Sequence, residues 1–487
     1  MKQKVTALMM TLSMALGAGG MYAGMQFMEH DQQDTKAEEL AVPAVTDVLK
    51  QDRDQEVEGL EKVKQAYDLI SSKYVEEVDE EELLEGAIQG MLTTLDDPYS
   101  VYMDKETAKQ FSDSLDSSFE GIGAEVGMDG GKIIIVSPFK NSPAEKAGLQ
   151  PNDQVITIDG ESVAGSDLNN TVLKIRGKKG TKVKIEVLRT GSKEKLTFDV
   201  TRDEIPIETV FSSVKTKGKS KYGYIEITSF SEDTAKDFTE ELTKLEQKNI
   251  KGLVLDVRGN PGGYLQSVEE ILKQFVTKDQ PYIQIEERNG DKKRYFSNLT
   301  EKKDYPVSVL IDKGSASASE ILAGALKEAG QYEIIGETSF GKGTVQQAVP
   351  MGDGSNIKLT LYKWLTPEGN WIHKKGVEPT ITVSQPKHLT TAPIQLEKPL
   401  AVDMNDEQIK IAQILLKGLG YDPGREDGYF GKKMAEAVKD FQKKNKLSAT
   451  GNIDVQTAEA INQKVSEQRL DGKHDLQLEK AIETLSK

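Results

Sequence analysis

The chain has 487 residues, enough for about three domains of roughly 150 residues each, and carries a net charge of −16. That charge repels phosphate backbones, so nucleic acid is not expected as a partner. With no cysteine and only four histidines, the sequence excludes disulfides and thiol nucleophiles, and we predict no metal site and no cofactor.

The first 28 residues predict export. Lys2 and Lys4 precede an uncharged stretch, residues 5–28, which is followed by an acidic tract. The stretch is long enough for a signal peptide or for a retained membrane anchor. We therefore expect an extracytoplasmic protein that is secreted or membrane-anchored and associated with the cell wall.

Residues 29–112 predict a polar spacer followed by a helical region. Apolar side chains recur at helical spacing from Leu60 to Tyr74 and again from Leu83 to Leu95, where Asp97-Pro98 ends the pattern. Core packing explains such stripes, and so does contact with a second copy of the chain. We expect a homodimer.

Residues 113–203 have the texture of short strands and turns around two short helices. The segments Phe119–Ala124 and Ser142–Leu149 give this region the pattern of a PDZ domain, which it resembles. Such a domain turns backbone N–H groups toward the terminal carboxylate of a peptide that adds a strand to its sheet. The candidate carboxylate-binding residues are Gly121, Ile122, Gly123 and Ala124, and a plain β-turn is the alternative for the two glycines.

Residues 204–390 have α/β texture. A buried strand, Gly252–Val257, leads into the turn Arg258–Gly263, and a helix follows from Leu265 to Phe275. The turn aims backbone N–H groups at one point. It could hold an oxyanion, or it could be only a tight connection.

A second strand, Val307–Asp312, turns into a helix that ends at Gly330. Ser317 lies at this sharp turn, where a nucleophile elbow would place a serine. Ser317 and Glu320 also fit a capping box, in which the serine would only cap the helix. The residues that follow, 336–343, nearly match a phosphate-binding loop, but Gly343 stands where the metal-binding hydroxyl is needed.

Lys342, Thr344 and Gln346 are two residues apart, and a strand would point all three to one face. A serine needs a base, and a desolvated lysine whose pKa falls toward neutrality can act as one where histidine is lacking. A glutamine can orient the amine of such a lysine. The alternatives are a solvated surface charge at Lys342 and an exposed strand residue at Gln346.

Three motifs together resemble the carboxyl-terminal processing, or tail-specific, proteases: Gly314–Glu320, Phe340–Gln346 and Arg258–Gly263. The resemblance covers about Leu60 to Val383 and implies a serine peptidase with a PDZ domain. It implies that Ser317 is the nucleophile, Lys342 the general base and Gln346 the orienting residue. It further implies a set of accessory residues: the oxyanion-hole amides of Ala318 and of Gly262 or Gly263, and Arg176 as a contact to the protease core when a tail is bound.

The last module follows a linker at residues 391–402. Predicted helices at Gln408–Leu419 and Ala435–Lys444, and a third after Thr450-Gly451, resemble a peptidoglycan-binding domain over residues 403–466. A three-helix spacer is the alternative. Residues 467–487 are expected to form a C-terminal tail.

The predicted fold class is multidomain α/β: a helical N-terminal region, a PDZ domain, a crotonase-like ββα serine protease core and a small three-helix C-terminal domain. We expect an exported endopeptidase that cuts protein or peptide substrates near exposed C-termini and is gated by its PDZ domain. Similarity to the enzymes of spore-forming Gram-positive bacteria implies envelope or sporulation signalling. The alternatives are a binding scaffold with an inactive core, and a hydrolase that pairs His373 with Ser317.

Overall fold

The computed structural model describes residues 59–113, 116–129, 131–166, 168–189, 194–472 and 474–486. The predicted export segment, residues 1–28, lies outside the described residues. Within those ranges, we find no helix with both the length and the apolar character needed to cross a bilayer.

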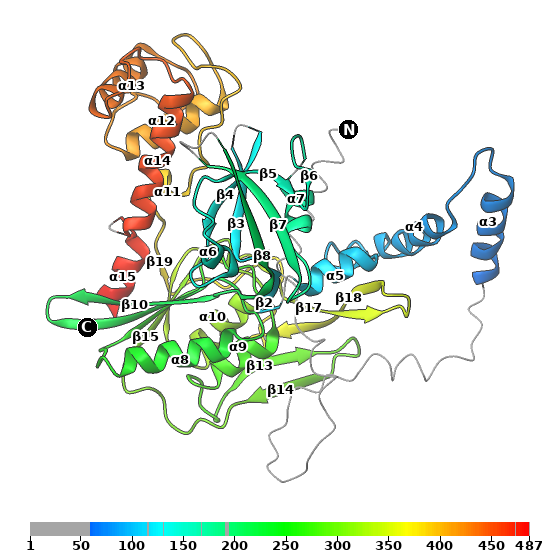
Figure 1. The fold of residues 1–487 in the computed structure, drawn as a ribbon. Coiled ribbons are helices and arrows are strands. Elements are labelled where there is room, and N and C mark those ends of the chain that lie inside the picture. The colour runs from blue at the N-terminus through cyan, green and yellow to red at the C-terminus, as the bar shows by residue number, and fades with distance from the viewer. Residues whose placement is uncertain are drawn as a thin grey trace.

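Two N-terminal helices, α3 (Leu60–Lys73) and α4 (Glu80–Thr93), extend away from the rest of the chain (Figure 1). The Asp79 carboxylate caps α4 by accepting hydrogen bonds from the N–H groups of Glu81 and Glu82. Neither helix buries a residue, so their apolar stripes do not pack against the core of this chain. A short strand, β1 (Val101–Met103), and helix α5 (Lys105–Asp113) follow.

The predicted PDZ region forms an antiparallel sheet in the order β3-β4-β5-β7-β8, with β6 beside β5. Ser142 and Gly148 cap helix α6, Ser142 by accepting from the Glu145 N–H and Gly148 in the left-handed conformation. Strands β3 and β8 are the two outer strands, and α7 lies next to β3. The elements are β2 (Ser118–Gly121), β3 (Ala124–Asp129), β4 (Lys132–Pro138), α6 (Pro143–Ala147), β5 (Gln154–Ile158), β6 (Glu161–Ser162), α7 (Leu168–Ile175), β7 (Lys182–Leu188), β8 (Lys195–Thr201) and β9 (Asp203–Pro206), which pairs with β2.

The central sheet of the following region has the order β10-β11-β12-β15-β16-β19, parallel except for the β10-β11 hairpin. Leu253 and Leu255 of β12 pack on one face, under helices α8, α9 and α10, and Val254 packs on the other face. The elements are β10 (Val210–Lys217), β11 (Ser220–Ile227), α8 (Thr234–Glu246), β12 (Leu253–Asp256), α9 (Leu265–Leu272), β15 (Val307–Ile311), α10 (Ala318–Glu328), β16 (Glu333–Gly336) and β19 (Ile381–Thr382).

A second, antiparallel sheet has the order β1-β18-β13-β14, with β17 on the other side of β18. Its later strands are β13 (Pro281–Glu286), β14 (Lys292–Phe296), β17 (Thr344–Pro350) and β18 (Asn356–Leu365). Val101 of β1 pairs with Lys358 of β18, although more than 250 positions separate them along the chain. This pairing brings the turn that precedes β1 against the core.

The C-terminal helices are α11 (Lys387–Thr390), α12 (Glu407–Gly418), α13 (Lys432–Lys444), α14 (Val455–Asp471) and α15 (Leu476–Thr484). Helices α12, α13 and α14 share one apolar core. Helix α14 leads back toward the central sheet, where Leu478, Ala481 and Leu485 of the final segment pack against the face that α8 to α10 leave open (Figure 1). The residues expected as a tail therefore include a docked helix.

Candidate active site

Ser317 occupies a strained backbone position between β15 and α10. Its φ of 54° and ψ of −114° lie in a region that residues other than glycine rarely adopt. The predicted capping box with Glu320 is present. Ordinary capping residues have extended backbone angles, so capping by itself does not account for this geometry. Strain of this kind is typical of a serine held at a nucleophile elbow.

The Glu320 carboxylate ties the Ser317 turn to the segment that carries Lys342. Glu320 is fully buried. Its Oε2 accepts from the backbone N–H of Ser317 at 2.9 Å and from that of Lys342 at 2.8 Å. Its Oε1 accepts from the Ser339 hydroxyl and from the Gly341 N–H, both at 2.6 Å. Burial raises the pKa of Glu320, and these four hydrogen bonds oppose the rise.

Lys342 is buried, with 2% of its surface exposed. Burial first, and the neighbouring Lys358 second, lower the pKa of Lys342 to about 7, against the opposing charges of Glu320 and Asp97. The Lys342 Nζ lies 4.9 Å from the centre of the Tyr99 ring. Lys342 is therefore not a solvated surface charge.

The expected strand from Lys342 to Gln346 is wrong in detail. Strand β17 begins at Thr344, and a register shift separates Val345 from Gln346. Gln346 is 5% exposed, and its Nε2 donates to the Thr344 and Thr360 hydroxyl oxygens, both at 3.0 Å. The strand therefore begins two residues later than expected and a bulge interrupts its pairing with β18, although the side chains of Thr344 and Gln346 still meet.

The two tryptophans of the chain hold the two carbonyl oxygens that directly precede β17. Trp364 donates its Nε1–H to the Lys342 carbonyl at 2.8 Å, and Trp371 donates to the Gly343 carbonyl at 2.7 Å. Because Glu320 holds the Lys342 N–H, the main chain of Lys342 is fixed at both its donor and its acceptor. The composition alone does not reveal this role.

Gly262 and Gly263 lie against the Ser317 turn. A Cβ built on Gly262 would lie 2.8 Å from the Ser317 Cβ and 3.1 Å from the Ala318 nitrogen. The Gly262 N–H already donates to the Asn260 side chain at 2.8 Å. Within the described residues, no acceptor is found for the N–H groups of Ala318 and Gly263. Of the two predicted glycines, Gly263 is therefore the one with an N–H left for an oxyanion.

Sequence reasoning missed the turn Asp97–Ser100 and Lys358. Lys358 is 6% exposed, and its Nζ lies 4.9 Å from the centre of the Phe111 ring. Burial lowers the pKa of Lys358, and the charge of Asp97 opposes this. In the sequence, Asp97-Pro98 indicated only the end of a helix. Its place beside Lys342 depends on the pairing of β1 with β18.

His373, the alternative base, lies beside Gly343. Its ring stacks on Trp371 at 5.0 Å between ring centres and meets Tyr99 edge-on at 6.5 Å. Burial lowers the pKa of His373, and its Nδ1 is buried with no hydrogen-bond partner in the described part of the chain. None of these contacts involves Ser317.

The predicted carboxylate-binding loop lies at the start of the outer strand β3. Gly121 ends β2, Ile122 is buried, Gly123 has a φ of 70°, and Ala124 begins β3. Over the described ranges, no acceptor is found for the N–H groups of Ile122 and Gly123. The loop thus offers donors beside a strand edge that a peptide could extend.

Arg176 is exposed and lies next to this loop rather than near Ser317. Its guanidinium stacks over the Phe119 ring at 5.0 Å. The structure brings the Ser317 turn, Gly262 and Gly263 together and joins them through Glu320 to the Lys342 main chain, while Gln346 contacts Thr344 and Thr360, and Arg176 lies beside the carboxylate-binding loop.

Four family models match the chain in the predicted order. Residues 14–107 match the N-terminal domain of the activating protease CtpB, and residues 121–200 match a PDZ domain. Residues 221–383 match peptidase family S41, and residues 405–461 match a peptidoglycan binding domain model.

Relatives align over most of the chain. The carboxy-terminal processing protease CtpB of Bacillus subtilis is 65% identical, covering 100% of this chain and 99% of the relative. The carboxy-terminal processing protease CtpA of the same organism is 44% identical, covering 88% of this chain and 90% of the relative. Among solved structures, a photosystem II D1 C-terminal processing protease is 26% identical, with 68% of this chain and 94% of that chain covered and a TM-score of 0.41. The chain therefore belongs to the carboxy-terminal processing proteases, serine peptidases of family S41 that carry a PDZ domain.

Proposed function

We propose that this protease uses Ser317 as nucleophile and Lys342 as general base, and that it works outside the cytoplasm on protein tails. The observation that carries the proposal is the buried Lys342 amine, with a pKa of about 7, on a residue whose main-chain N–H shares the Glu320 carboxylate with the N–H of the strained Ser317 turn. An amine with that pKa is neutral in a large fraction of molecules at neutral pH and can accept the serine proton.

The reaction follows the usual course of acyl transfer. The neutral Lys342 amine takes the Ser317 hydroxyl proton while the oxygen attacks the scissile carbonyl, and the N–H groups of Ala318 and Gly263 receive the resulting oxyanion. Collapse of this intermediate breaks the C–N bond, and the Lys342 ammonium gives its proton to the leaving amine. Water then attacks the acyl-enzyme, with Lys342 as base again, and releases the new C-terminus.

The charge of Lys358 helps to set the acid limb of the pH profile, the range over which kcat/KM rises with pH. The base must be neutral, so kcat/KM should rise with pH through the Lys342 pKa of about 7. Lys358 lowers that pKa, whereas Glu320 and Asp97 raise it. Lys358→Met removes a neighbouring positive charge, so the Lys342 pKa should rise and the acid limb of the profile should move to higher pH.

A pH profile of kcat/KM on an unfolded model protein measures this shift. Lys221→Met, at an exposed position on β11, is the matched control and should leave the limb in place. His373→Ala should also leave the acid limb of the pH profile at the same pH, because Lys342 and not His373 is the proposed base. A folded but inactive His373→Ala enzyme, or a limb unmoved by Lys358→Met, would contradict the assignment.

The PDZ domain is proposed to capture the substrate tail. The N–H groups of Ile122 and Gly123 have no acceptor among the described residues, and the edge of β3 is open to an added strand. A free terminal carboxylate accepts charge-assisted hydrogen bonds that a terminal amide cannot match. Arg176, stacked on Phe119 beside this loop, is proposed to signal occupancy to the protease core.

Amidating the C-terminus of a substrate should therefore lower kcat/KM about tenfold or more, the value of one to two charged hydrogen bonds. The comparison uses two peptides of identical sequence, one ending in a free acid and one in an amide, with cleavage followed by chromatography. An internal Asp→Asn change in the same peptide is the control for loss of one charge. Equal rates for acid and amide would rule out carboxylate capture.

The apolar stripes of α3 and α4 support a homodimer. Leu60, Leu69 and Met91 are 57%, 63% and 59% exposed on helices that reach away from the core (Figure 1). We propose that a second copy of the chain covers them. Light scattering should give twice the monomer mass for the wild-type protein. The variant that combines Leu69→Glu with Met91→Glu should give the monomer mass. A monomeric wild-type protein would contradict the proposal.

The C-terminal module matches a family model described as a peptidoglycan binding domain. It is proposed to bind peptidoglycan and so to hold the enzyme at the cell wall. This supports an extracytoplasmic location and agrees with the export segment expected at the N-terminus. A role in sporulation signalling is proposed from similarity to the Bacillus subtilis relatives. The test uses the Ser317→Ala protein, which should be retained on purified cell walls. Retention should be lost when residues 403–471 are replaced by a flexible linker that leaves α15 docked on the central sheet.

A further inference from the structure

A chain of hydrogen bonds leads from the turn before β1 to Gln346. The Asp97 carboxylate accepts from the Ser100 hydroxyl at 2.6 Å and from the Tyr99 N–H at 3.1 Å. The Ser100 hydroxyl oxygen in turn accepts from the Thr360 N–H at 3.1 Å. The Thr360 side chain also lowers the pKa of Asp97 through a hydrogen bond. Both the main chain and the side chain of Thr360 are thus fastened to this turn.

The direction of these hydrogen bonds decides how Gln346 is oriented. A threonine hydroxyl has one proton, and a carboxylate can only accept. If Thr360 gives its proton to Asp97, its oxygen can only accept from Gln346, as the 3.0 Å contact with the Gln346 Nε2 requires. The nitrogen and oxygen of a carboxamide are similar in shape, so packing alone would not distinguish the two orientations.

This orientation matters because only the carboxamide oxygen can accept from an ammonium group. With Nε2 held by Thr360 and Thr344, the Oε1 of Gln346 is the atom not used by either threonine. In the reverse orientation, the atom not held by the threonines would be a donor, which cannot stabilise an ammonium group.

We propose that Asp97 and Thr360 are positioning residues that fix the orientation of the Gln346 carboxamide, so that the turn between α4 and β1 completes the catalytic cluster. The inference rests on the proposed roles of Lys342 and Gln346. It adds to them a fixed order of hydrogen bonds. The Gln346 Nε2 donates to the Thr360 hydroxyl, and that hydroxyl donates to the Asp97 carboxylate.

Asp97 has a second effect, which can be separated from the first. Burial opposes its ionisation, but hydrogen bonds from Ser100, Thr360 and the Tyr99 N–H, together with the charge of His373, hold its pKa below the usual range. Its negative charge faces Lys342 and Lys358 and raises the pKa of both, while the charge of Glu320 also acts on Lys342. Thr360 has no charge, so its loss should disturb the orientation of Gln346 alone.

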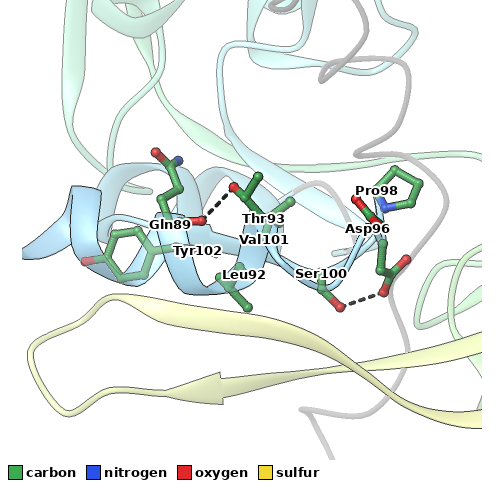
Figure 2. A pocket seen from close by; sticks show the side chains of 9 residues that line it. Gln89, Leu92, Thr93, Asp96, Pro98, Ser100, Val101 and Tyr102 are labelled. Carbon is green, nitrogen blue, oxygen red and sulfur yellow. Dashed lines mark hydrogen bonds between the residues drawn. The ribbon is translucent and has the colours of Figure 1, made fainter. Parts of the chain in front are cut away.

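The outer end of the network opens at the base of α4. Figure 2 shows the hydroxyl of Ser100 in its hydrogen bond at the edge of a groove of about 470 Å³ between α4 and the turn, lined by residues that include Leu92, Asp97 and Tyr102. The network therefore runs from the surface next to the N-terminal helices to the buried cluster. The N-terminal region thereby contributes the turn that positions Thr360 and, through it, Gln346.

The test measures kcat, KM and the pH profile of Thr360→Val, Thr360→Ser and Asp97→Asn in the full-length protein. Thr360→Val should lower kcat roughly 10- to 100-fold, the usual range for groups that orient a catalytic residue, with the acid limb unchanged. Thr360→Ser should restore most of the loss. Asp97→Asn keeps an acceptor for Thr360 but loses the charge, so it should move the acid limb to lower pH with a smaller loss of kcat.

A double-mutant cycle supplies the decisive comparison. Adding Thr360→Val to Gln346→Ala should cost nothing further, because the residue that Thr360 orients is already gone. Thr382→Val, exposed on β19, is the control, and tryptophan fluorescence verifies folding because Trp364 and Trp371 lie beside Lys342.

Three outcomes would overturn the inference: full activity of Thr360→Val, a loss from Thr360→Val that adds in full to that of Gln346→Ala, or wild-type kcat in Gln346→Ala. Each of these leaves the proposed roles of Ser317 and Lys342 intact. Activity in Ser317→Ala would instead overturn the proposed function itself, so the two failures are distinguishable.

Discussion

Lys342→Met is expected to lower kcat/KM for an unfolded protein substrate roughly 10⁴-fold or more, because nucleophile and base act as one unit. Ser317→Ala should cause a loss of the same order, and the double variant should be no worse than either single variant. The measurement is cleavage of the unfolded substrate at a pH above 8, where the Lys342 amine of the wild type, with its pKa of about 7, is mostly neutral. Lys342→Arg should be equally inactive, because a guanidinium does not lose its proton in this range.

Lys221→Met is the matched control and should keep full activity, since it removes an exposed lysine from β11. Methionine is nearly the length of lysine, so Lys342→Met should preserve the packing around Trp364 and the fold, which tryptophan fluorescence would verify. Substantial cleavage by a folded Lys342→Met or Ser317→Ala enzyme would refute the dyad. It would also favour the alternative in which the catalytic group lies elsewhere.

Arg258→Ala should destabilise the protease core by about 3–5 kcal/mol, the typical cost of removing one partner from a buried ion pair. The Arg258 guanidinium contacts Asp256 at 2.5 Å and Asp475 of the α15 segment at 2.7 Å, and only 17% of its side chain is exposed. Without Arg258, two largely buried carboxylates would face each other with no positive charge between them. Because Arg258 begins the turn that carries Gly263, kcat should fall as well.

Denaturant unfolding followed by tryptophan fluorescence measures this effect, because Trp364 is buried in the protease core and Trp371 is hydrogen-bonded to the main chain beside it. Lys273→Ala is the control: it breaks an exposed pair with Glu270 on α9, 41% and 51% exposed, and should change stability by no more than about 0.5 kcal/mol. If Arg258→Ala changed the free energy of unfolding as little as the control does, the C-terminal segment would have no part in holding the turn.

The strand–turn–helix unit around Ser317 was predictable because its signals are local. An apolar strand, a turn of small residues and a capping box lie within about fifteen consecutive positions, and the structure has β15, Ser317 and α10 in that order. The same holds for the α6 helix, where Ser142 and Gly148 are caps whose backbone and hydrogen-bonding preferences act over one turn.

The course of the chain through Lys342 was not predictable in the same way. The alternation of Lys342, Thr344 and Gln346 indicated a strand, but the bulge after Val345 depends on pairing with β18 rather than on residues nearby. Similarly, both Gly262 and Gly263 fit an oxyanion turn by sequence. Only the position of the Asn260 side chain distinguishes them, because it accepts a hydrogen bond from the Gly262 N–H and leaves the Gly263 N–H for an oxyanion.

Composition and short-range spacing are enough to predict the family motifs, the order of the modules and the residue types that can perform the chemistry. They do not predict that Asp97 and Lys358 lie beside Lys342 or that Asp475 pairs with Arg258, which depends on the packing of distant segments. Asp97 and Lys342, and likewise Arg258 and Asp475, are more than 200 positions apart in the chain, and the pairing of β1 with β18 and the docking of α15 on the central sheet bring them together. Lys358 reaches Lys342 through the pairing of β17 with β18. An apolar stripe or a buried charge shows that a side chain needs a partner, but only the folded packing of strands and helices determines which partner it meets.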